Sequence, residues 1–287
     1  MRRPPARLRL LADRDEELLP FVVRRGGVGE SLARAAIERG GAFLRGKRER
    51  DAQAKVARGD RVEVTLQAPS AELPRECVLH LDELVLAVDK PAGVAAQEDL
   101  AGGPALPALC SALLARMGEK QTQALLVHRL DRGTTGVTVL ARTRRAQAAL
   151  LEEFRRHRPR KEYRALVAGA PALDEGVADE PIAGRPALTR WRVFQRFEGA
   201  SLIAALPETG RTHQVRIHLR QLGCPLLGDR SEGGPAFLTR PSGARIDFSR
   251  PLLHALSLSL RHPSGSALNL LAPLPPDFEA VCTFLSG

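Results

Sequence analysis

Hydrophobic residues in the first quarter of the chain follow two different periods. Val62, Val64 and Leu66 alternate with charged or hydroxyl-bearing neighbours, which predicts a half-buried strand. Residues 29–40 have the spacing of a short amphipathic helix that ends at a glycine. The stretch between them, AFLRGK, has the composition of a strand followed by a turn. These patterns indicate a small α+β unit.

The rest of the chain mixes short β-rich runs with amphipathic stretches. We predict strands at residues 84–88, 136–141, 163–169, 191–197, 200–206 and 253–260. We predict helices at residues 107–120, from a cap at Thr143 through Phe154, and at 210–223. There is no internal repeat and no regular alternation of strand and helix. An α+β fold with a mixed, largely antiparallel sheet therefore fits better than a doubly wound fold.

Breaks in the pattern suggest four parts. Residues 1–18 are mixed and Arg-rich, and we expect a loosely ordered N-terminal arm. Residues 67–76, QAPSAELPRE, contain two prolines and no periodicity, which indicates a linker. The linker separates a small domain at 19–66 from a larger domain at 77–287.

Composition adds a candidate partner. Of 287 residues, 43 are Lys or Arg and 33 are Asp or Glu, so the net charge is +10. A basic excess of this size favours a polyanionic partner, because neutralised phosphates release counterions. Only five of the basic residues are lysines. Arginine forks suit phosphates, but a GC-rich coding bias would give the same dominance, so charge makes a nucleic acid plausible without establishing it.

The cysteines and the chain's hydropathy bear on location. Cys77, Cys110, Cys224 and Cys282 lie far apart, in no pair or cluster with zinc-site spacing. We expect reduced thiols in a cytoplasmic protein, since no signal peptide is recognisable and no segment approaches the length of a membrane span.

Two motif-like stretches are set aside. GAFLRGK has the spacing of a phosphate-binding loop, but the next residue, Arg48, cannot replace the Ser or Thr that binds magnesium. His213 and His218 would lie about 140° apart around a helix, so they do not share a face as a metal pair would. We expect no metal and no other cofactor.

A carboxylate between two guanidinium groups is the candidate for chemistry. HRLDRGTTG (128–136) places Asp131 between Arg129 and Arg132, and alone it would be an ordinary charged turn. Two further segments change that interpretation. KEYRALV begins a strand with the only tyrosine, Tyr163, and ETGRTHQVRIHLRQLGCPLLGD begins a helix with Arg211 beside a glycine turn.

With these segments the chain resembles the RluA-type pseudouridine synthases over about residues 78–276. Five motifs follow the family's order: LVLAVDKPAGV, HRLDRGTTGVTVLAR, KEYRALVAG, LPETGRTHQVRIHLRQLGCPLLGD and LLHALSLSLRHP. The resemblance implies an enzyme that isomerises uridine to pseudouridine in RNA. That reaction needs an ionised carboxylate, a surface that retains the detached uracil, and a route for the C5 proton.

The resemblance also implies roles for residues. Asp131 would be the catalytic carboxylate, Arg211 the cation beside it, and Tyr163 the ring that stacks on uracil and assists C5 proton transfer. His128, Arg129 and Arg132 are predicted to contact the substrate or the RNA backbone, although His128 is equally compatible with packing below the turn. Whether Asp131 attacks C1′, adds to C6 or assists a glycal route stays open.

Residues 19–66 resemble, more loosely, an S4 RNA-binding module. The basic residues predicted to contact phosphates there are Arg34, Arg39, Arg45, Lys47 and Arg48. Such a module favours ribosomal RNA over transfer RNA as substrate. We expect RNA as the partner of a monomer, with no membrane association and no obligate protein partner.

Departures from the family pattern leave alternatives open. Gly133 replaces a common acidic residue, so the turn after Asp131 is expected to be more flexible. Residues 94–100 and 228–237 lack the usual His-Pro and tyrosine, which puts substrate contacts in doubt. The alternatives are a non-catalytic RNA-binding or assembly factor, and a glycosylase or hydrolase that uses Asp131 with water.

Overall fold

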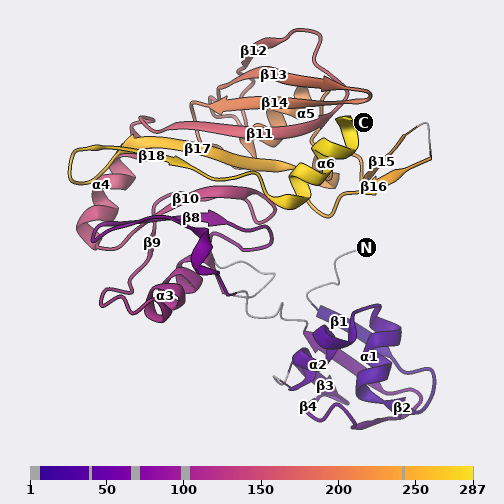
Figure 1. The fold of residues 1–287 in the computed structure, drawn as a ribbon. Helices are drawn as coiled ribbons and strands as arrows, with labels where there is room; N and C mark the ends of the chain where they lie inside the picture. The colour runs from indigo at the N-terminus through magenta and orange to yellow at the C-terminus, as the bar shows by residue number, and fades with distance from the viewer. Residues whose placement is uncertain (1–6, 39–40, 66–71, 98–103, 241–242, 287) are drawn as a thin grey trace. The chain divides into compact units, whose positions relative to one another are not determined.

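The chain divides into two compact units, of which the larger comprises Glu72–Gln97 and Ala105–Gly287. The computed structural model describes residues 7–38, 41–65, 72–97, 104–240 and 243–286. Figure 1 shows both units, and each is considered by itself.

The N-terminal unit is a small antiparallel sheet covered by two helices. The strand order is β1 (Arg7–Leu11), β6 (Arg61–Thr65), β3 (Ala42–Leu44) and β4 (Lys47–Glu49). A second pair joins β2 (Glu16–Glu17) to β5 (Lys55–Val56), and the helices are α1 (Leu18–Gly26) and α2 (Glu30–Glu38). Leu18, Phe21, Ile37, Val62 and Val64 are fully buried between these layers.

The structure differs from the expected arm at residues 7–17. Leu8 and Leu10 pair with Val64 and Val62, and Leu8 is buried in the same core. Residues 7–11 are therefore a strand of the small domain, even though two of these five residues are arginines. The helix and the alternating strand lie where the sequence predicts them, while Leu66 lies outside the described residues.

The larger unit is built on one ten-stranded sheet. The main order is β12 (Glu175–Ala178), β13 (Thr189–Phe197), β14 (Ala200–Pro207), β11 (Arg160–Ala168), β17 (Leu253–Arg261), β10 (Thr135–Ala141), β8 (Val85–Lys90) and β7 (Val78–Leu81). In addition, β9 (Leu125–Leu126) pairs with β10, and β18 (Ala267–Leu271) pairs with β17. Figure 1 shows these strands as one continuous twisted sheet. Only β10 and β17 run parallel among the described pairs, which confirms the α+β class and the largely antiparallel sheet.

The described part of this unit contains four α-helices. They are α3 (Leu106–Arg116), α4 (Arg144–Arg155), α5 (Gln214–Gln221) and α6 (Pro276–Ser286). Short elements complete it: η1 (Arg75–Cys77), η2 (Arg230–Glu232) and the pair β15 (Phe237–Thr239) with β16 (Arg245–Asp247). As predicted, Thr143 caps α4 by accepting a hydrogen bond from the Ala146 N–H. Within the described residues, no helix is both long and apolar enough to cross a membrane.

The parallel contact between β10 and β17 requires a glycine. Gly136 has φ +111°, and a Cβ atom there would lie 2.2 Å from the carbonyl oxygen of Ala255. Any side chain would therefore separate the two strands. This close approach brings the loop before β10 against the beginning of β17, where the candidate site is found.

Candidate active site

Asp131 lies in the short loop between β9 and β10. The loop is anchored on both sides of it, because Leu130 is 6% exposed in the core and the Thr134 N–H donates to the Asp131 carbonyl at 3.0 Å. The Asp131 side chain itself is 26% exposed. The carboxylate is therefore held on a fixed backbone but stays accessible.

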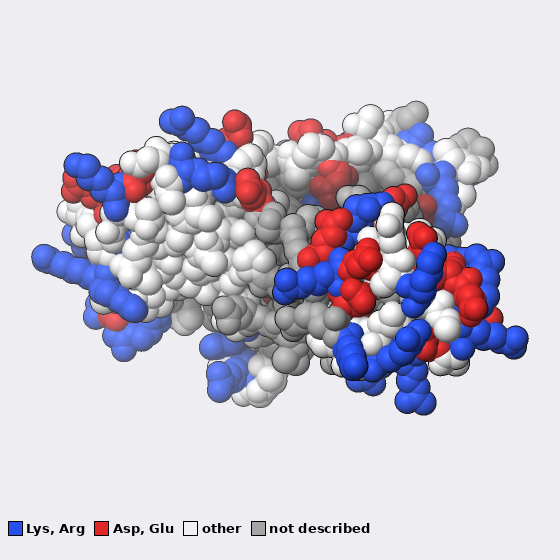
Figure 2. Space-filling view, turned by 90° about the horizontal axis from the view of Figure 1, so that it is seen from below, with Lys and Arg blue, Asp and Glu red and all other residues white. Residues whose placement is uncertain are grey.

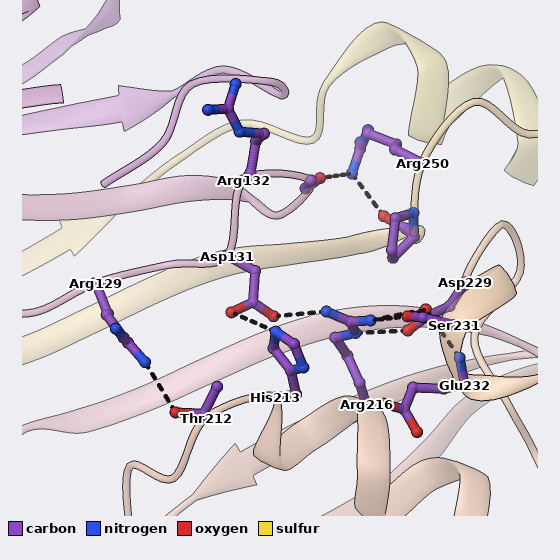
Figure 3. A network of polar contacts seen from close by, with 12 residues as sticks. Arg129, Asp131, Arg132, Thr212, His213, Arg216, Asp229, Ser231, Glu232 and Arg250 are labelled. Atoms are coloured by element: carbon purple, nitrogen blue, oxygen red, sulfur yellow. Dashed lines mark hydrogen bonds and ion pairs between the residues drawn. The ribbon is translucent and has the colours of Figure 1, made fainter. Parts of the chain in front are cut away.

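Two cationic or potentially cationic groups from α5 face this carboxylate (Figure 3). Arg216 Nη1 donates to Asp131 Oδ2 at 3.2 Å, and His213 Nε2 lies 3.7 Å from Asp131 Oδ1. His213 is the N-cap of α5 and has φ +57°, a left-handed conformation that few non-glycine residues adopt. This backbone geometry places the ring of His213 on the same side of α5 as Arg216, one turn away.

Arg216 is held in place by a second carboxylate. Its Nε and Nη2 donate to the two oxygens of Asp229 at 2.6 and 2.9 Å, and Nη2 also donates to Ser231 Oγ. Both side chains of this pair are buried, at 8% and 1% exposed. Burial opposes the charge of Arg216, but its bonds to Asp229 and Asp131 raise the pKa of the guanidinium above its ordinary value. Arg216 is thus a permanently charged bridge between Asp131 and Asp229.

Arg211 does not occupy the position that the sequence analysis gave it. It lines the same pocket, but its Nε donates to the Pro186 carbonyl at 2.9 Å, and its backbone N–H donates to Gln214 Oε1. The reason is the start of α5: Arg211 lies in the turn before the helix, whereas Arg216 lies inside it. The spacing of His213 and Arg216, three apart on one helix side, was the available signal.

A pocket of about 340 Å³ opens above Asp131. Its lining includes Tyr163 and Lys161 of β11 and Leu253 of β17. Burial, and then the negative charge of Asp131, raises the pKa of the Tyr163 phenol well above its ordinary value, so it remains protonated at neutral pH. Burial lowers the pKa of Lys161 to about 8, and its Nζ donates to the Thr209 carbonyl at 3.0 Å. The pocket therefore combines a carboxylate, a neutral phenol and an apolar wall.

Comparison with known proteins identifies the family. The model of the RNA pseudouridylate synthase family matches residues 84–221. The ribosomal large subunit pseudouridine synthase D of Xanthomonas campestris pv. campestris is 36% identical over 251 residues, which cover 78% of this chain and 74% of that protein. This chain belongs to the RNA pseudouridylate synthase family.

Further relatives support that assignment. They also support the activity of an enzyme that isomerises uridine in RNA. The synthase D of Pasteurella multocida is 31% identical, over 79% of this chain and 77% of that protein. Among solved structures, human RNA pseudouridylate synthase domain containing 4 is similar, with a TM-score of 0.61 and 27% identity, over 73% of this chain and 93% of that one. All of α5 and every lining residue of the pocket except Leu253 lie inside the matched family region.

Within the synthase pocket, His128 is held by packing. Its Nε2 accepts a hydrogen bond from the Val139 N–H at 2.9 Å, and its ring stacks on Phe154 with centroids 4.6 Å apart. Burial lowers the pKa of His128 to about 3, so the imidazole is neutral and carries its proton on Nδ1. The sequence leaves two roles open for His128, contact with the substrate and packing below the turn. These contacts favour packing.

The two arginines that flank Asp131 point in different directions (Figure 3). Arg129 is exposed at the pocket rim and donates to Thr212 Oγ1 at 2.8 Å. Arg132 is half-buried, and its Nη1 donates to the Gly93 carbonyl at 3.1 Å. Arg129 is therefore available at the pocket entrance, while Arg132 binds the neighbouring 91–94 turn.

Lys90 is a buried residue of the site that sequence reasoning did not single out. It is 0% exposed, and its Nζ donates to the carbonyls of Val94 at 2.9 Å, Pro91 at 3.1 Å and Arg132 at 3.4 Å. Burial, and then the nearby positive charge of Arg250, lowers the pKa of Lys90 to about 7. The ammonium joins the turn after β8 to the loop that carries Asp131.

Gly133, where the sequence predicts a more flexible turn, lies against two residues that precede β17, Arg250 and Pro251. The Gly133 carbonyl accepts a hydrogen bond from Arg250 Nη1 at 3.2 Å. A Cβ atom at this position would lie 3.0 Å from Cδ of Pro251, which leaves little room for an acidic side chain unless the proline ring shifts. The turn is fixed from outside by Arg250 and Pro251.

The predicted phosphate contacts of the N-terminal unit are largely paired with acids. Arg34 donates to Glu30 at 3.0 Å, and Arg45 makes a forked pair with Asp60 at 2.8 and 2.6 Å. Lys47 is exposed at the β3–β4 hairpin. Arg39 and the side chain of Arg48 lie outside the described part. On the side drawn in Figure 2, basic and acidic side chains are interleaved over the unit at the right of the view.

Proposed function

We propose that this family member converts uridine to pseudouridine in large-subunit ribosomal RNA, with Asp131 as the catalytic carboxylate. The observation that carries the proposal is the position of Asp131, which is accessible from the pocket and bonded to Arg216, an arginine that is itself held by a buried ion pair with Asp229. The choice of RNA rests on the relatives from Xanthomonas and Pasteurella, both named for the ribosomal large subunit.

The reaction is an isomerisation, and it balances without a redox partner. The N1–C1′ bond breaks, a C5–C1′ bond forms, C5 loses a proton, and N1 gains one. Asp131 can serve by attacking C1′, by adding to C6 or by assisting a glycal route. In each case Arg216 and His213 orient the carboxylate and stabilise its negative charge in a partly dry site.

The walls of the pocket suit a uracil that is detached and turned. The half-buried ring of Tyr163 and the side chain of Leu253 offer a flat, apolar surface on which the base can be retained. Because burial keeps the phenol of Tyr163 protonated, its hydroxyl acts as a hydrogen-bond donor near C5 rather than as a strong base. A target uridine inside structured RNA must be flipped out to reach this pocket, at a cost of a few kcal/mol.

The N-terminal unit is proposed as an S4-like RNA-binding module. Its exposed Lys47, together with Arg45 at the same hairpin, can contact the phosphate backbone. The pair between Arg45 and Asp60 is 58% exposed on the arginine side, so a phosphate can compete for the guanidinium.

Release of tritium from C5 tests the proposal. The full chain is incubated with ribosomal RNA whose uridines are tritiated at C5, and we expect release in proportion to the pseudouridine formed. Asp131→Asn should reduce the rate by at least about a hundredfold, because a positioned charge acting on the reaction centre is lost. Asp179→Asn is the matched control, since Asp179 is an exposed carboxylate outside the pocket.

Three results would contradict the proposal. Tight RNA binding without tritium release from ribosomal RNA would indicate a binding or assembly factor. Free uracil among the products would indicate a hydrolase. Full activity of Asp131→Asn would remove Asp131 from the catalytic role while leaving the family intact.

A further inference from the structure

A second group of chemically active side chains lies away from the pocket. His80 of β7, Asp82 of the β7–β8 turn and His262, just after β17, converge on one point. His80 Nε2 lies 2.9 Å from Asp82 Oδ2, and His262 Nε2 lies 3.0 Å from the same oxygen. One ligand atom from each residue lies within 4.8 Å of the other two.

Only an ion-pair contact faces the buried nitrogen of His262. The residue is 8% exposed, and its Nε2 lies 3.0 Å from Asp82 Oδ2 without forming a hydrogen bond among the described atoms. Such an atom is costly to bury unless something else satisfies it. Its other nitrogen, Nδ1, accepts the Ser264 backbone N–H at 3.2 Å and lies 2.6 Å from Ser264 Oγ. An ion bound at Nε2 would move the ring proton to Nδ1, where Ser264 Oγ can accept it in place of the backbone bond.

We propose that His80, Asp82 and His262 form a binding site for a divalent transition metal ion of the zinc class. Two imidazoles and one carboxylate are a ligand set that zinc accepts, with water as the fourth ligand. Metal–ligand bonds of about 2.0–2.2 Å place tetrahedral ligand atoms roughly 3.4 Å apart. The observed spacings of 2.9 and 3.0 Å around Asp82 require a small outward shift, and the imidazole nitrogens, which lie within 4.8 Å of each other, would have to approach that separation as well.

The remaining parts of the site fit this role. His80 and Asp82 have side chains that are 31% and 34% exposed, so an ion and its water can enter from that side. The second oxygen of Asp82, Oδ1, accepts the backbone N–H groups of Leu84 and Val85. These bonds orient the carboxylate as outer contacts do in metal sites and leave Oδ2 for the ion.

The site would join two hairpins that are distant in sequence. It links the β7–β8 turn to the β17–β18 hairpin. Lys90 and His254, which lie near the candidate active site, are at the other ends of β8 and β17. His254, whose ring contacts Thr135 next to the catalytic loop, is eight residues from His262, or about 26 Å along the strand. The ion would stabilise the sheet and would not touch the reacting uridine, so this proposal does not rest on the catalytic role of Asp131.

Zinc titration of the full chain tests the site. The metal-stripped protein is titrated with zinc chloride against a chromophoric chelator, and we expect one zinc per chain and a higher melting temperature. His80→Ala and Asp82→Asn should weaken binding by at least roughly 10- to 100-fold, since even loss of an outer contact has an effect of that size. Glu83→Gln is the matched control, because Glu83 is an exposed carboxylate of the same turn and has no place in the cluster.

A spectroscopic readout keeps the test independent of folding. Cobalt(II) bound to the wild type should give the visible spectrum of a four-coordinate ion with nitrogen and oxygen ligands. With His80→Cys, a sulfur-to-cobalt charge-transfer band should appear, which a merely structural change would not produce. Absence of stoichiometric zinc binding, equal affinity of His80→Ala and wild type, or no new band with His80→Cys would each overturn the proposal.

Discussion

Arg216 and Arg45 both make forked pairs with an aspartate, but in opposite surroundings. The side chains of Arg216 and Asp229 are 8% and 1% exposed, whereas those of Arg45 and Asp60 are 58% and 15% exposed. In the first pair the charges have lost their water and depend on each other. In the second, water and salt compete with the pair. The same forked pairing therefore fixes an arginine that contacts Asp131 in one unit and leaves an arginine open to solvent in the other.

The largest effect is expected when the buried pair is broken. Arg216→Met leaves Asp229 buried without its cation, which should destabilise the larger unit by about 3–5 kcal/mol. It should also abolish tritium release, because Asp131 loses the bond that orients it. Urea unfolding of the full chain, followed by a specific probe of the larger unit, measures the first effect.

A residue of the same helix provides the control for that comparison. Arg220→Met removes an exposed guanidinium that lies 3.3 Å from Glu232, and its effect on stability should be below about 1 kcal/mol. Equal destabilisation by the two substitutions would show that burial does not distinguish them.

Lys90 extends the comparison to a buried cation that has carbonyl partners instead of a forked carboxylate. Because burial lowers its pKa to about 7 from 10.5, the unfolded chain binds an additional proton between these values. The contribution of this group to stability therefore rises as the pH increases from 7 to 10.5. The free energy of unfolding of wild type minus that of Lys90→Met should increase over this range, by up to about 5 kcal/mol.

The difference between the two proteins isolates Lys90, since Lys161 titrates in both. A difference that is flat or falls between pH 7 and 10.5 would contradict the assigned burial effect.

Substitution of Arg211 tests which of the two arginines, Arg211 or Arg216, acts on Asp131. Arg211→Ala should leave stability within about 0.5 kcal/mol, because the side chain is only half-buried and loses only one bond to the Pro186 carbonyl. We expect a higher KM for RNA with a smaller loss in kcat than Arg216→Lys causes. Initial rates of tritium release over a range of RNA concentrations separate these terms, and a loss in kcat equal to that of Arg216→Lys would restore Arg211 as the cation that acts on Asp131.

How well the sequence predicts an element depends on how far apart along the chain the residues that stabilise it lie. The cap at Thr143, the strand around Val62 and the helix at 29–40 depend on neighbouring residues, and they lie where they were expected. The strand at Arg7–Leu11 alternates as well, but it is short and Arg-rich, and it is stabilised by β6, more than fifty residues away.

The candidate site could also be predicted only where local motifs specify its residues. Asp131 and Tyr163 could be proposed from motifs, and the structure brings both to one pocket. The choice between Arg211 and Arg216 depended on where α5 begins and on Asp229, which follows the helix. Lys90 and His262 act through contacts with distant segments, so no local spacing could reveal them.

The smallest effect on stability is expected at the exposed pair of Arg45 and Asp60. The consequence of changing this pair should instead be seen in RNA binding. Arg45→Gln should change the free energy of unfolding of the N-terminal unit by less than about 1 kcal/mol, since an exposed pair contributes little. If Arg45 exchanges Asp60 for a phosphate, the substitution should weaken RNA binding and reduce the slope of log affinity against log salt by about 1. Arg9→Gln is the matched control, because Arg9 is an exposed arginine of the same sheet, 3.5 Å from Glu63. Fluorescence anisotropy with a ribosomal RNA fragment at several salt concentrations measures both slopes. An unchanged slope for Arg45→Gln would mean that Arg45 stays with Asp60 in the complex, and that its pair behaves like the buried one despite its exposure.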